Sequence, residues 1–404
     1  MKTIVLVGDG MGDRPCPELE NQTPLQAADI PNMRRIAAAG KLYMADTVPE
    51  GLPPGSDVAN LGLLGYDARE FYTGRAPIEA AGAGLPLAPD DVAIRCNLVN
   101  IGSDAGRDPA EETMVDYSSG HISSEEAAPL IESLQAALGR EGLTFHAGVQ
   151  YRHLLIWNRG PAQPVTQPPH DILGQKIAPH LPRGDRAEEL QALMEASKEI
   201  FLDHPVNRAR RERGDVPVTQ IWLWGQGPAL KLPTYQTLYG MSGTIITAVD
   251  LVRGLGVLAG LDTPKVEGAT GWIDTNYAGK VDAALEALKT RDFAYVHVEA
   301  PDECGHVGDA KLKTRAIEDF DAKVVGPIWE ALEALGAPYR LLVTMDHRTP
   351  VEIRGHSAEP VPLATLEGPV GKVTEQSAFD EFVHGGKSEI RTFEWIPRWL
   401  RGEA

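Results

Sequence analysis

Three short segments, far apart in the chain, carry the carboxylate and imidazole groups of a candidate two-metal site. Each follows an apolar run: IVLV leads into the turn GDGMGD, FAYVHV into APDECGH, and YRLLVTM into Asp346 and His347. Because ligands of open α/β sheets bind at the carboxyl ends of the strands, we expect these groups to meet at one sheet edge. Carboxylate and imidazole ligands suit two divalent ions such as Zn²⁺ or Mn²⁺. The candidate ligands are Asp9, Asp302, His306, Asp346, His347 and His356.

A fourth segment, GLPPGSDVAN, supplies a candidate nucleophile, Ser56. Pro-Pro-Gly does not continue a helix, so Ser56 or Asp57 is predicted to be the N-cap of the apolar helix that follows. A serine there lies among free backbone N–H groups at the positive end of a helix, where a phosphate binds readily. Metal coordination is one way to activate its hydroxyl. The simpler interpretation of Ser56 is an ordinary helix cap.

Together with three further segments, these motifs resemble the archaeal-type, cofactor-independent phosphoglycerate mutases of the alkaline phosphatase superfamily. The further segments are TPLQAADIPNM at 23–33, YTGRAPIEA at 72–80 and DVAIRCN at 91–97, so the resemblance covers nearly the whole chain. It implies that 2-phosphoglycerate and 3-phosphoglycerate are interconverted through a phosphoserine at Ser56, without bisphosphoglycerate. It also implies the ligand sets of two divalent ions, which would be Mn, Zn, Co or Mg. One set is Asp302, His306 and His356; the other is Asp9, Ser56, Asp346 and His347.

Two departures from the family pattern bear on the substrate. The segment IWLWGQG places Trp224 and Gln226 where many archaeal-type mutases have an arginine-containing turn. Arg348 follows Asp346-His347 where a small hydroxyl residue is more usual. The segments PPHDILG at 168–174 and LDHPVN at 202–207 resemble a bacterial branch that has also been proposed to be a homoserine kinase.

The same metal core therefore leaves other functions open. Transfer from ATP to an amino alcohol would make the protein a homoserine kinase-like phosphotransferase. Transfer of the phosphoryl group to water would make it a phosphatase of small phosphate esters. A more remote alternative is a non-catalytic protein that binds metal or phosphate, which a missing nucleophile or ligand would favour.

The net charge of −19 argues against binding to nucleic acid or to an anionic membrane surface, so the expected partner is a small phosphorylated acid. An enzyme of anionic esters then needs bound cations and a few inward-facing basic groups to invert the local field. The candidate substrate contacts are Arg75, Arg95, Arg152, His153, His170 and Lys280. The oligomeric state is left open.

Cysteine content and hydropathy indicate a cytoplasmic protein. The 3 cysteines include no Cys-x-x-Cys pair, which favours reduced thiols. No apolar run approaches the roughly 20 residues of a membrane span, and the first residues form a strand where a signal peptide would be basic.

The elements that must position these groups indicate an α/β fold. We expect a metal-binding domain with a parallel sheet, like that of alkaline phosphatase, and a smaller α+β lid domain inserted into it. The metal domain is predicted to comprise residues 1–105 and 218–404, with IWLWG at 221–225 starting a strand of its sheet. The inserted substrate or lid domain is predicted at 106–217. Helices are expected near 31–40, 185–213, 240–260, 279–290 and 310–336.

Overall fold

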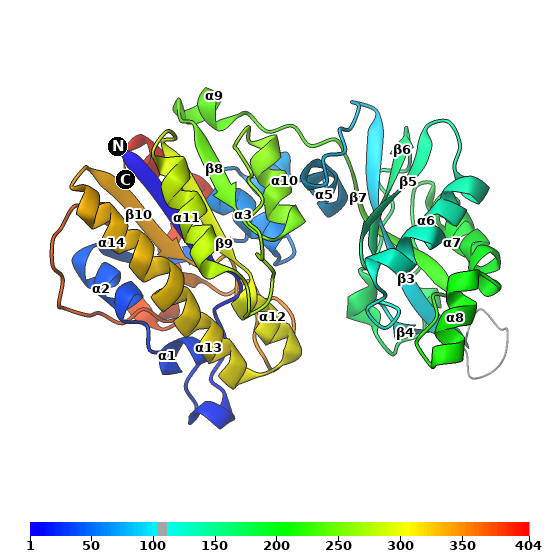
Figure 1. Cartoon of the computed structure of the whole chain (residues 1–404), viewed down its shortest axis with the longest axis horizontal. Helices are drawn as coiled ribbons and strands as arrows, with labels where there is room; N and C mark the ends of the chain where they lie inside the picture. The colour runs from blue at the N-terminus through cyan, green and yellow to red at the C-terminus, as the bar shows by residue number, and fades with distance from the viewer. Residues whose placement is uncertain (103–110, 404) are drawn as a thin grey trace. The chain divides into compact units, whose positions relative to one another are not determined.

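The computed structural model describes residues 1–102 and 111–403, and its chain divides into two compact units. Unit 1 comprises Met1–Tyr72 and Lys231–Ala404, and unit 2 comprises Thr73–Leu230. Figure 1 shows both units. The inserted unit is thus larger than the predicted 106–217, and the predicted boundaries at 105/106 and 217/218 are wrong.

Unit 1 is built on a seven-stranded sheet with the order β12-β2-β11-β10-β1-β9-β8. In that order the strands are Ile390–Arg391, Lys41–Asp46, Val361–Gly368, Tyr339–Thr344, Lys2–Gly8, Phe293–Val298 and Gly243–Ile246. The sheet is mixed, because β11 is antiparallel to both β10 and β2. The remaining neighbours run parallel, which confirms the α/β class.

The central strands place the candidate ligands. β1 lies between β10 and β9 and pairs with both in parallel, with Val7 opposite Thr344 on one side and His297 on the other. The three strands therefore end at the same edge, as their apolar runs predicted. All three are buried along almost their whole length, which explains why their sequences are continuous apolar runs without alternation.

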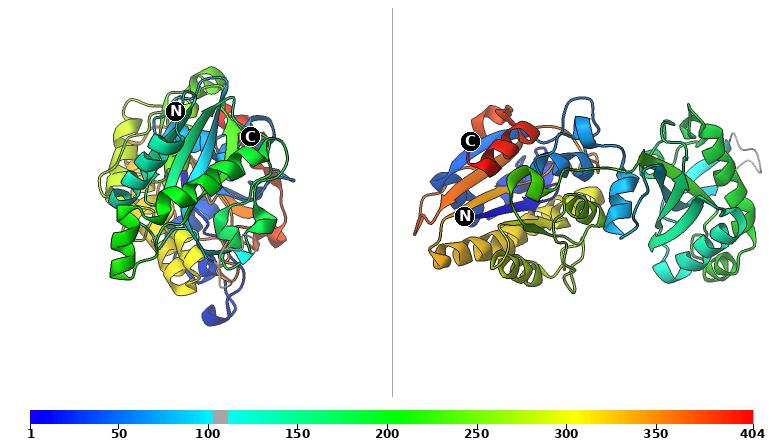
Figure 2. Two further views of the ribbon diagram at one scale, coloured as in Figure 1. Left: turned by 90° about the vertical axis from the view of Figure 1, so that its right-hand side faces the viewer. Right: turned by 90° about the horizontal axis from the view of Figure 1, so that it is seen from above.

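Helices cover both faces of this sheet; Figure 2 shows α14 and α15 on opposite sides of it. The longer helices are α2 (Pro31–Ala39), α3 (Ser56–Leu63), α10 (Asp250–Leu258), α11 (Tyr277–Leu288), α12 (Ala300–Val307), α13 (Ala310–Phe320), α14 (Gly326–Leu335) and α15 (Thr392–Arg401). The shorter ones are α1 (Pro24–Ala27), α4 (Ala68–Phe71) and α9 (Tyr235–Tyr239), with brief turns at Pro17–Leu19 and Val383–Gly386. A π-helical turn, Asp321–Val325, interrupts the helix expected at 310–336.

Unit 2 contains a five-stranded antiparallel sheet in which β3 (Asp91–Gly102) pairs with three other strands. Its partners are β4 (Thr113–Asp116), β6 (Arg152–Asn158) and β7 (Gln220–Pro228), and β5 (Leu143–Val149) pairs with β6. The prediction that IWLWG belongs to the main sheet is therefore wrong: Trp222 lies opposite Asn97 of β3.

The helices of unit 2 pack on this sheet or extend from it. They are α5 (Arg75–Gly82), α6 (Ser124–Leu138), α7 (Ala187–Leu202) and α8 (Pro205–Arg213), with short turns at Pro169–Ile172 and Ala178–His180. The helix predicted at 185–213 is two helices, because Pro205 starts α8 after a break at Asp203 and His204. The stretch predicted as a turn and helix at 240–260 contains β8 as well as α10.

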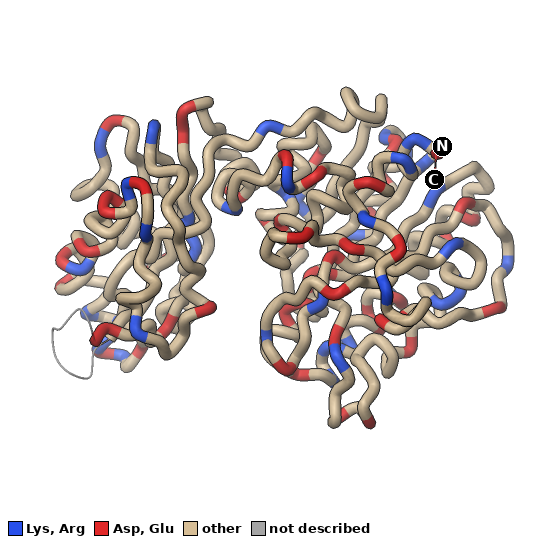
Figure 3. Tube along the Cα trace, turned by 180° about the vertical axis from the view of Figure 1, so that it is seen from behind, with Lys and Arg blue, Asp and Glu red and all other residues tan. Residues whose placement is uncertain are grey.

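Charged side chains and cysteines occur in both units. Lysine, arginine, aspartate and glutamate side chains are spread along both units (Figure 3). Cys16, Cys96 and Cys304 are free thiols, and all three are buried. Within the described residues, no helix combines the length and apolar character that a membrane crossing would require.

Candidate active site

The candidate ligands lie where the central strands of unit 1 end. Asp9 directly follows β1, and Asp346 and His347 follow β10 after Met345. Asp302 and His306 lie in α12, which begins just after β9, so they stand one helical turn apart. Each of these side chains is therefore positioned by the end of a buried strand or by the helix that follows that strand.

Ser56 is the first residue of α3, and the N-cap is Gly55. The predicted cap at Ser56 or Asp57 is therefore off by one or two positions. Gly55 has an extended backbone, and the free N–H groups of the first helical turn remain beside Ser56. A phosphate on the Ser56 hydroxyl would lie at the positive end of α3.

One group of ligands gathers around Asp302. The Nε2 atom of His306 lies 3.2 Å from Asp302 Oδ2, and the Nε2 atom of His356 lies 3.5 Å from Asp302 Oδ1. The two Nε2 atoms are 3.1 Å apart. His306 Nδ1 lies 3.0 Å from the carbonyl oxygen of Arg354, a contact that turns Nε2 toward the group. Three donor atoms from α12 and the loop after β10 thus converge.

A second group surrounds Ser56. Its Oγ lies 3.1 Å from His347 Nε2 and donates to Asp9 Oδ2 at 3.4 Å. His347 Nε2 is 3.5 Å from Asp9 Oδ1 and 3.6 Å from Asp346 Oδ2. The four side chains are buried, so the hydroxyl, the imidazole and two carboxylates share a space with little access to water.

The electrostatics of this edge fit divalent cations. Burial and the nearby carboxylates of Asp346 and Asp302 raise the pKa of Asp9 well above its usual value. Asp9 Oδ1 is buried and has no hydrogen-bond partner. Burial opposes the charge of Asp302 as well, and His306 and His356 nevertheless hold its pKa well below the usual value. Clustered carboxylates with an unpaired oxygen are a suitable donor set for metal ions.

His297 is a candidate ligand that the sequence analysis missed. It lies within β9, fully buried, and its Nε2 is 3.1 Å from Asp9 Oδ2. Burial lowers the pKa of His297 to about 4, so the ring is neutral at pH 7. One signal in the sequence was its position near the end of the apolar run FAYVHV, just before the APDECGH turn. Side chains alternate along a strand, so His297 lies on the same face as Tyr295.

The donor atoms that lie closest together form different sets from those that the family resemblance implies. Two sets have donor atoms within 4.8 Å of one another: Asp302 with His347 and His356, and Asp9 with His297 and Asp346. His347 thus lies between the two groups, its ring 4.2 Å from that of His356 between centroids. His306 lies beside the first set, because its Nε2 is 3.2 Å from Asp302 Oδ2.

Comparison with known proteins identifies the family of this chain. The family model for 2,3-bisphosphoglycerate-independent phosphoglycerate mutase matches residues 37–207. A Geobacter sulfurreducens protein with the name "probable 2,3-bisphosphoglycerate-independent phosphoglycerate mutase" is 51% identical over 94% of both chains. A Methanosarcina mazei protein with the name 2,3-bisphosphoglycerate-independent phosphoglycerate mutase is 49% identical over 94% of both chains.

The chain belongs to the 2,3-bisphosphoglycerate-independent phosphoglycerate mutase family. Solved structures agree with this mutase family. A Thermoplasma acidophilum cofactor-independent phosphoglycerate mutase aligns with a TM-score of 0.61 at 27% identity, covering 99% of this chain and all of that one. A Pyrococcus horikoshii protein aligns with a TM-score of 0.80 at 30% identity, covering 100% of this chain and 98% of that one.

The mutase substrate is anionic, and unit 2 carries a cluster of basic groups that includes three predicted contacts. Arg75 Nε lies 3.0 Å from Glu79 Oε1, and Arg95 Nε lies 2.8 Å from Glu79 Oε2. Arg152 contributes to the electrostatics of the same carboxylate, and the Arg95 guanidinium stacks 4.1 Å from the Trp224 ring centroid. Two guanidinium groups thus pair with one carboxylate, and a third acts on it electrostatically.

His170 lies beside this cluster. Its side chain is 47% exposed and its ring packs edge-on at 5.5 Å from that of Trp224, between centroids. Gln226, one of the departures from the family pattern, is engaged within unit 2. Its Oε1 accepts from Thr166 Oγ1 at 2.8 Å, and its Nε2 donates to the Pro164 carbonyl oxygen.

Two of the predicted substrate contacts are buried. Lys280 is fully buried and donates to the carbonyl oxygen of His297 at 2.9 Å, so its ammonium group is engaged with β9. His153 is 3% exposed and accepts from the Gly148 N–H at 3.0 Å. Burial lowers the pKa of His153 to about 3, so at pH 7 it carries no charge to offer an anion.

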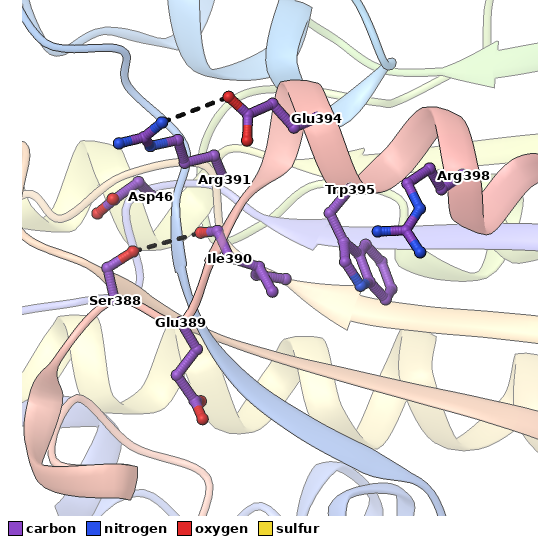
Figure 4. A pocket seen from close by; sticks show the side chains of 8 residues that line it. All are labelled: Asp46, Ser388, Glu389, Ile390, Arg391, Glu394, Trp395 and Arg398. Atoms are coloured by element: carbon purple, nitrogen blue, oxygen red, sulfur yellow. Dashed lines mark hydrogen bonds and ion pairs between the residues drawn. The ribbon is translucent and has the colours of Figure 1, made fainter. Parts of the chain in front are cut away.

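A surface cavity of unit 1 does not coincide with the ligand groups. It measures about 740 Å³ and lies beside β12 and the start of α15 (Figure 4). Its lining carries both signs of charge, with Arg391 and Glu394 paired at 3.4 Å. The residues that line it are Asp46, Ser388, Glu389, Ile390, Arg391, Glu394, Trp395 and Arg398. None of them belongs to the ligand groups, so this cavity does not mark the candidate active site.

Metal binding should depend on pH through His306. Burial disfavours its charged form, yet Asp302 raises its pKa to about 9 in the metal-free protein. A metal ion bound through His306 would displace that proton, so affinity should then fall about tenfold for each pH unit below about 9. Burial lowers the pKa of His347 to about 4, so this ring adds no second proton in that range. Titration of metal-free protein with Mn²⁺ between about pH 6 and 9 checks the slope. A flat profile would contradict it.

Proposed function

We propose that the protein interconverts 2-phosphoglycerate and 3-phosphoglycerate through a phosphoserine at Ser56, without bisphosphoglycerate. The names of its relatives support the substrate. The observation that carries the mechanism is the position of Ser56 Oγ, 3.1 Å from His347 Nε2 and 3.4 Å from Asp9 Oδ2. A hydroxyl placed among metal-type ligands at a helix N-terminus is suited to accept a phosphoryl group.

We propose that two divalent ions, of Mn, Zn, Co or Mg, occupy this edge. When bound, they would stabilise the negative charge of the entering and leaving oxygens during in-line transfer. Asp302, His306 and His356 would hold one ion. Asp9, Ser56, Asp346 and His347 would hold the other, with His297 near Asp9 as a further nitrogen donor.

The transfer runs in two steps that conserve the phosphoryl group. In the first, Ser56 Oγ loses its proton and forms a bond to phosphorus, while the bond from phosphorus to the substrate ester oxygen breaks and that oxygen gains a proton. In the second, the other hydroxyl of glycerate loses its proton and forms a bond to phosphorus, while the bond from phosphorus to Ser56 Oγ breaks and Oγ regains a proton. The free N–H groups of the first turn of α3 hydrogen-bond the phosphate in between.

We propose that unit 2 recognises the substrate and shields it from water, the role expected for a lid domain. Arg75, Arg95 and Arg152 are its proposed contacts to the carboxylate or phosphate, with His170 beside them. Arg75 and Arg95 both pair with Glu79, which holds their guanidinium groups together, and Arg152 lies near enough to lower the pKa of the same carboxylate. We also propose a cytoplasmic location, which the three free cysteines favour.

Two reactions measured under the same metal conditions test the substrate. Conversion of 3-phosphoglycerate, coupled to enolase without bisphosphoglycerate, should be rapid. ATP-dependent phosphorylation of homoserine should stay at background, because three arginines gathered in unit 2 favour an anionic ester over an ammonium.

Robust phosphorylation of homoserine with negligible mutase turnover would contradict the phosphoglycerate assignment and leave the Ser56 mechanism standing. Release of inorganic phosphate in place of isomerisation would indicate a phosphatase. Absence of every phosphoryl transfer in metal-loaded protein would contradict the mechanism itself.

A further inference from the structure

We propose that Asn60 is a positioning residue of the active site, whose side-chain amide ties the nucleophile's helical turn to the carboxylate of Asp346. This inference rests on the proposed function, since it assigns how Ser56 and Asp346 are held in one geometry. Asn60 lies on α3 one turn after Ser56, and its side chain is fully buried.

A single amide group makes both contacts. Asn60 Nδ2 donates to the Ser56 carbonyl oxygen at 2.8 Å and to Asp346 Oδ2 at 2.8 Å. Ser56 begins a helix and Asp346 follows β10, so these contacts join two elements that are far apart in sequence. Both protons of the amide are used, which is the full donor capacity of an asparagine side chain.

Tyr295 supports the orientation of the amide. Its hydroxyl, fully buried on β9, donates to Asn60 Oδ1. The Ser56 carbonyl and the Asp346 carboxylate only accept, so the amide nitrogen must face them and the amide oxygen then faces the Tyr295 hydroxyl, which can donate to it. A flipped amide would set its oxygen against two other acceptors, and a buried polar atom without a partner costs about 1–3 kcal/mol.

The remaining partners of Asp346 show what Asn60 adds. Asp346 Oδ1 accepts from the backbone N–H groups of Gly10 at 3.1 Å and His347 at 2.9 Å. Oδ2 accepts from Asn60 and lies 3.6 Å from His347 Nε2, on the side of the second ligand group. The backbone thus anchors one oxygen, and Asn60 sets the orientation of the oxygen that faces the metal-type donors.

The decisive variant is Asn60→Asp, which keeps the shape of the side chain and replaces the donating nitrogen with an oxygen. We expect metal affinity, kcat or both to fall about 10- to 100-fold, the usual effect of losing a hydrogen-bond partner of a metal ligand. Tyr295→Phe removes only the orienting hydroxyl, so it should lower the same quantities by a smaller factor. The absorption spectrum of bound Co²⁺ should change in both variants.

The chain offers a matched control for each variant. Asn32 Nδ2 donates to Asp321 Oδ2 at 2.9 Å, also buried and also in unit 1, so Asn32→Asp makes the same chemical change away from the ligand groups. Tyr235, whose hydroxyl donates to the Leu64 carbonyl oxygen at 2.9 Å, gives Tyr235→Phe. Both controls should lower the thermal midpoint and leave metal affinity and the Co²⁺ spectrum unchanged.

The inference is overturned if folded Asn60→Asp keeps wild-type metal affinity, Co²⁺ spectrum and kcat, or if Asn32→Asp reduces them equally. Should Asn60→Asp fail to fold, Tyr295→Phe decides: an unchanged spectrum and kcat would equally overturn the proposal. Failure of the proposed function looks different, because wild-type protein would then bind no metal and form no phosphoserine.

Discussion

We expect Ser56→Ala to abolish phosphoryl transfer and to leave the protein folded. The substitution removes the one atom proposed to bond to phosphorus, so kcat should fall by roughly 10⁴- to 10⁶-fold, as in other enzymes that lose their nucleophile. Alanine suits the first turn of a helix, and the N-cap Gly55 makes no side-chain hydrogen bond, so α3 should form as before. Enzyme quenched with substrate and digested for mass spectrometry should carry phosphate on Ser56 in the wild type.

Ser388→Ala serves as the control, since Ser388 is exposed and lies outside the ligand groups. It should show wild-type turnover and the same phosphorylated peptide. Substantial activity in Ser56→Ala, or phosphate on another residue of the quenched wild type, would refute the role of Ser56.

Removal of metal should inactivate the enzyme as completely as loss of the serine. Asp9, Asp302 and Asp346 are buried together, and without cations their charges oppose one another. Activity should fall to background after exhaustive chelation and return with Mn²⁺, Zn²⁺ or Co²⁺, and less with Mg²⁺, because imidazole ligands suit the first three ions better. The thermal midpoint should rise with metal concentration, since the ions bind the folded state.

A pair of histidine variants separates metal loss from general damage. His356→Ala should bind one ion more weakly. His384→Ala, which loses only a contact to Glu389 at 2.6 Å, should bind both as the wild type does. Full activity in protein shown by elemental analysis to be free of metal would rule out the two-metal mechanism.

The α/β fold and the meeting of the ligands were predictable because each of the three ligand-bearing segments follows a continuous apolar run. Such runs mark parallel strands, and parallel strands end at one edge. The domain boundaries were not predictable in this way. β3 and β7 are also apolar runs, and only their antiparallel pairing, with Trp222 opposite Asn97, assigns them to unit 2.

The surroundings of His297, Tyr295 and Lys280 were not predicted, and the shared cause is that each polar group is buried against a partner distant in sequence. His297 and Tyr295 lie inside a strand that reads as core, and their partners Asp9 and Asn60 are far away in sequence. Lys280 lies on α11, where a lysine ordinarily faces solvent, yet it is drawn inward by the His297 carbonyl oxygen. Local sequence does not encode such contacts.

The three buried cysteines can report when the structure around each of them unfolds. Burial raises the pKa of Cys16 to about 11 and that of Cys304 to about 12, and it also raises the pKa of Cys96, so none is a reactive thiolate at neutral pH. A thiol reagent can therefore modify them only when the surrounding structure opens. Cys96 lies in β3 of unit 2, while Cys16 and Cys304 lie in unit 1. The labelling rates of these peptides would measure how easily each unit unfolds, and whether metal ions protect one unit more than the other.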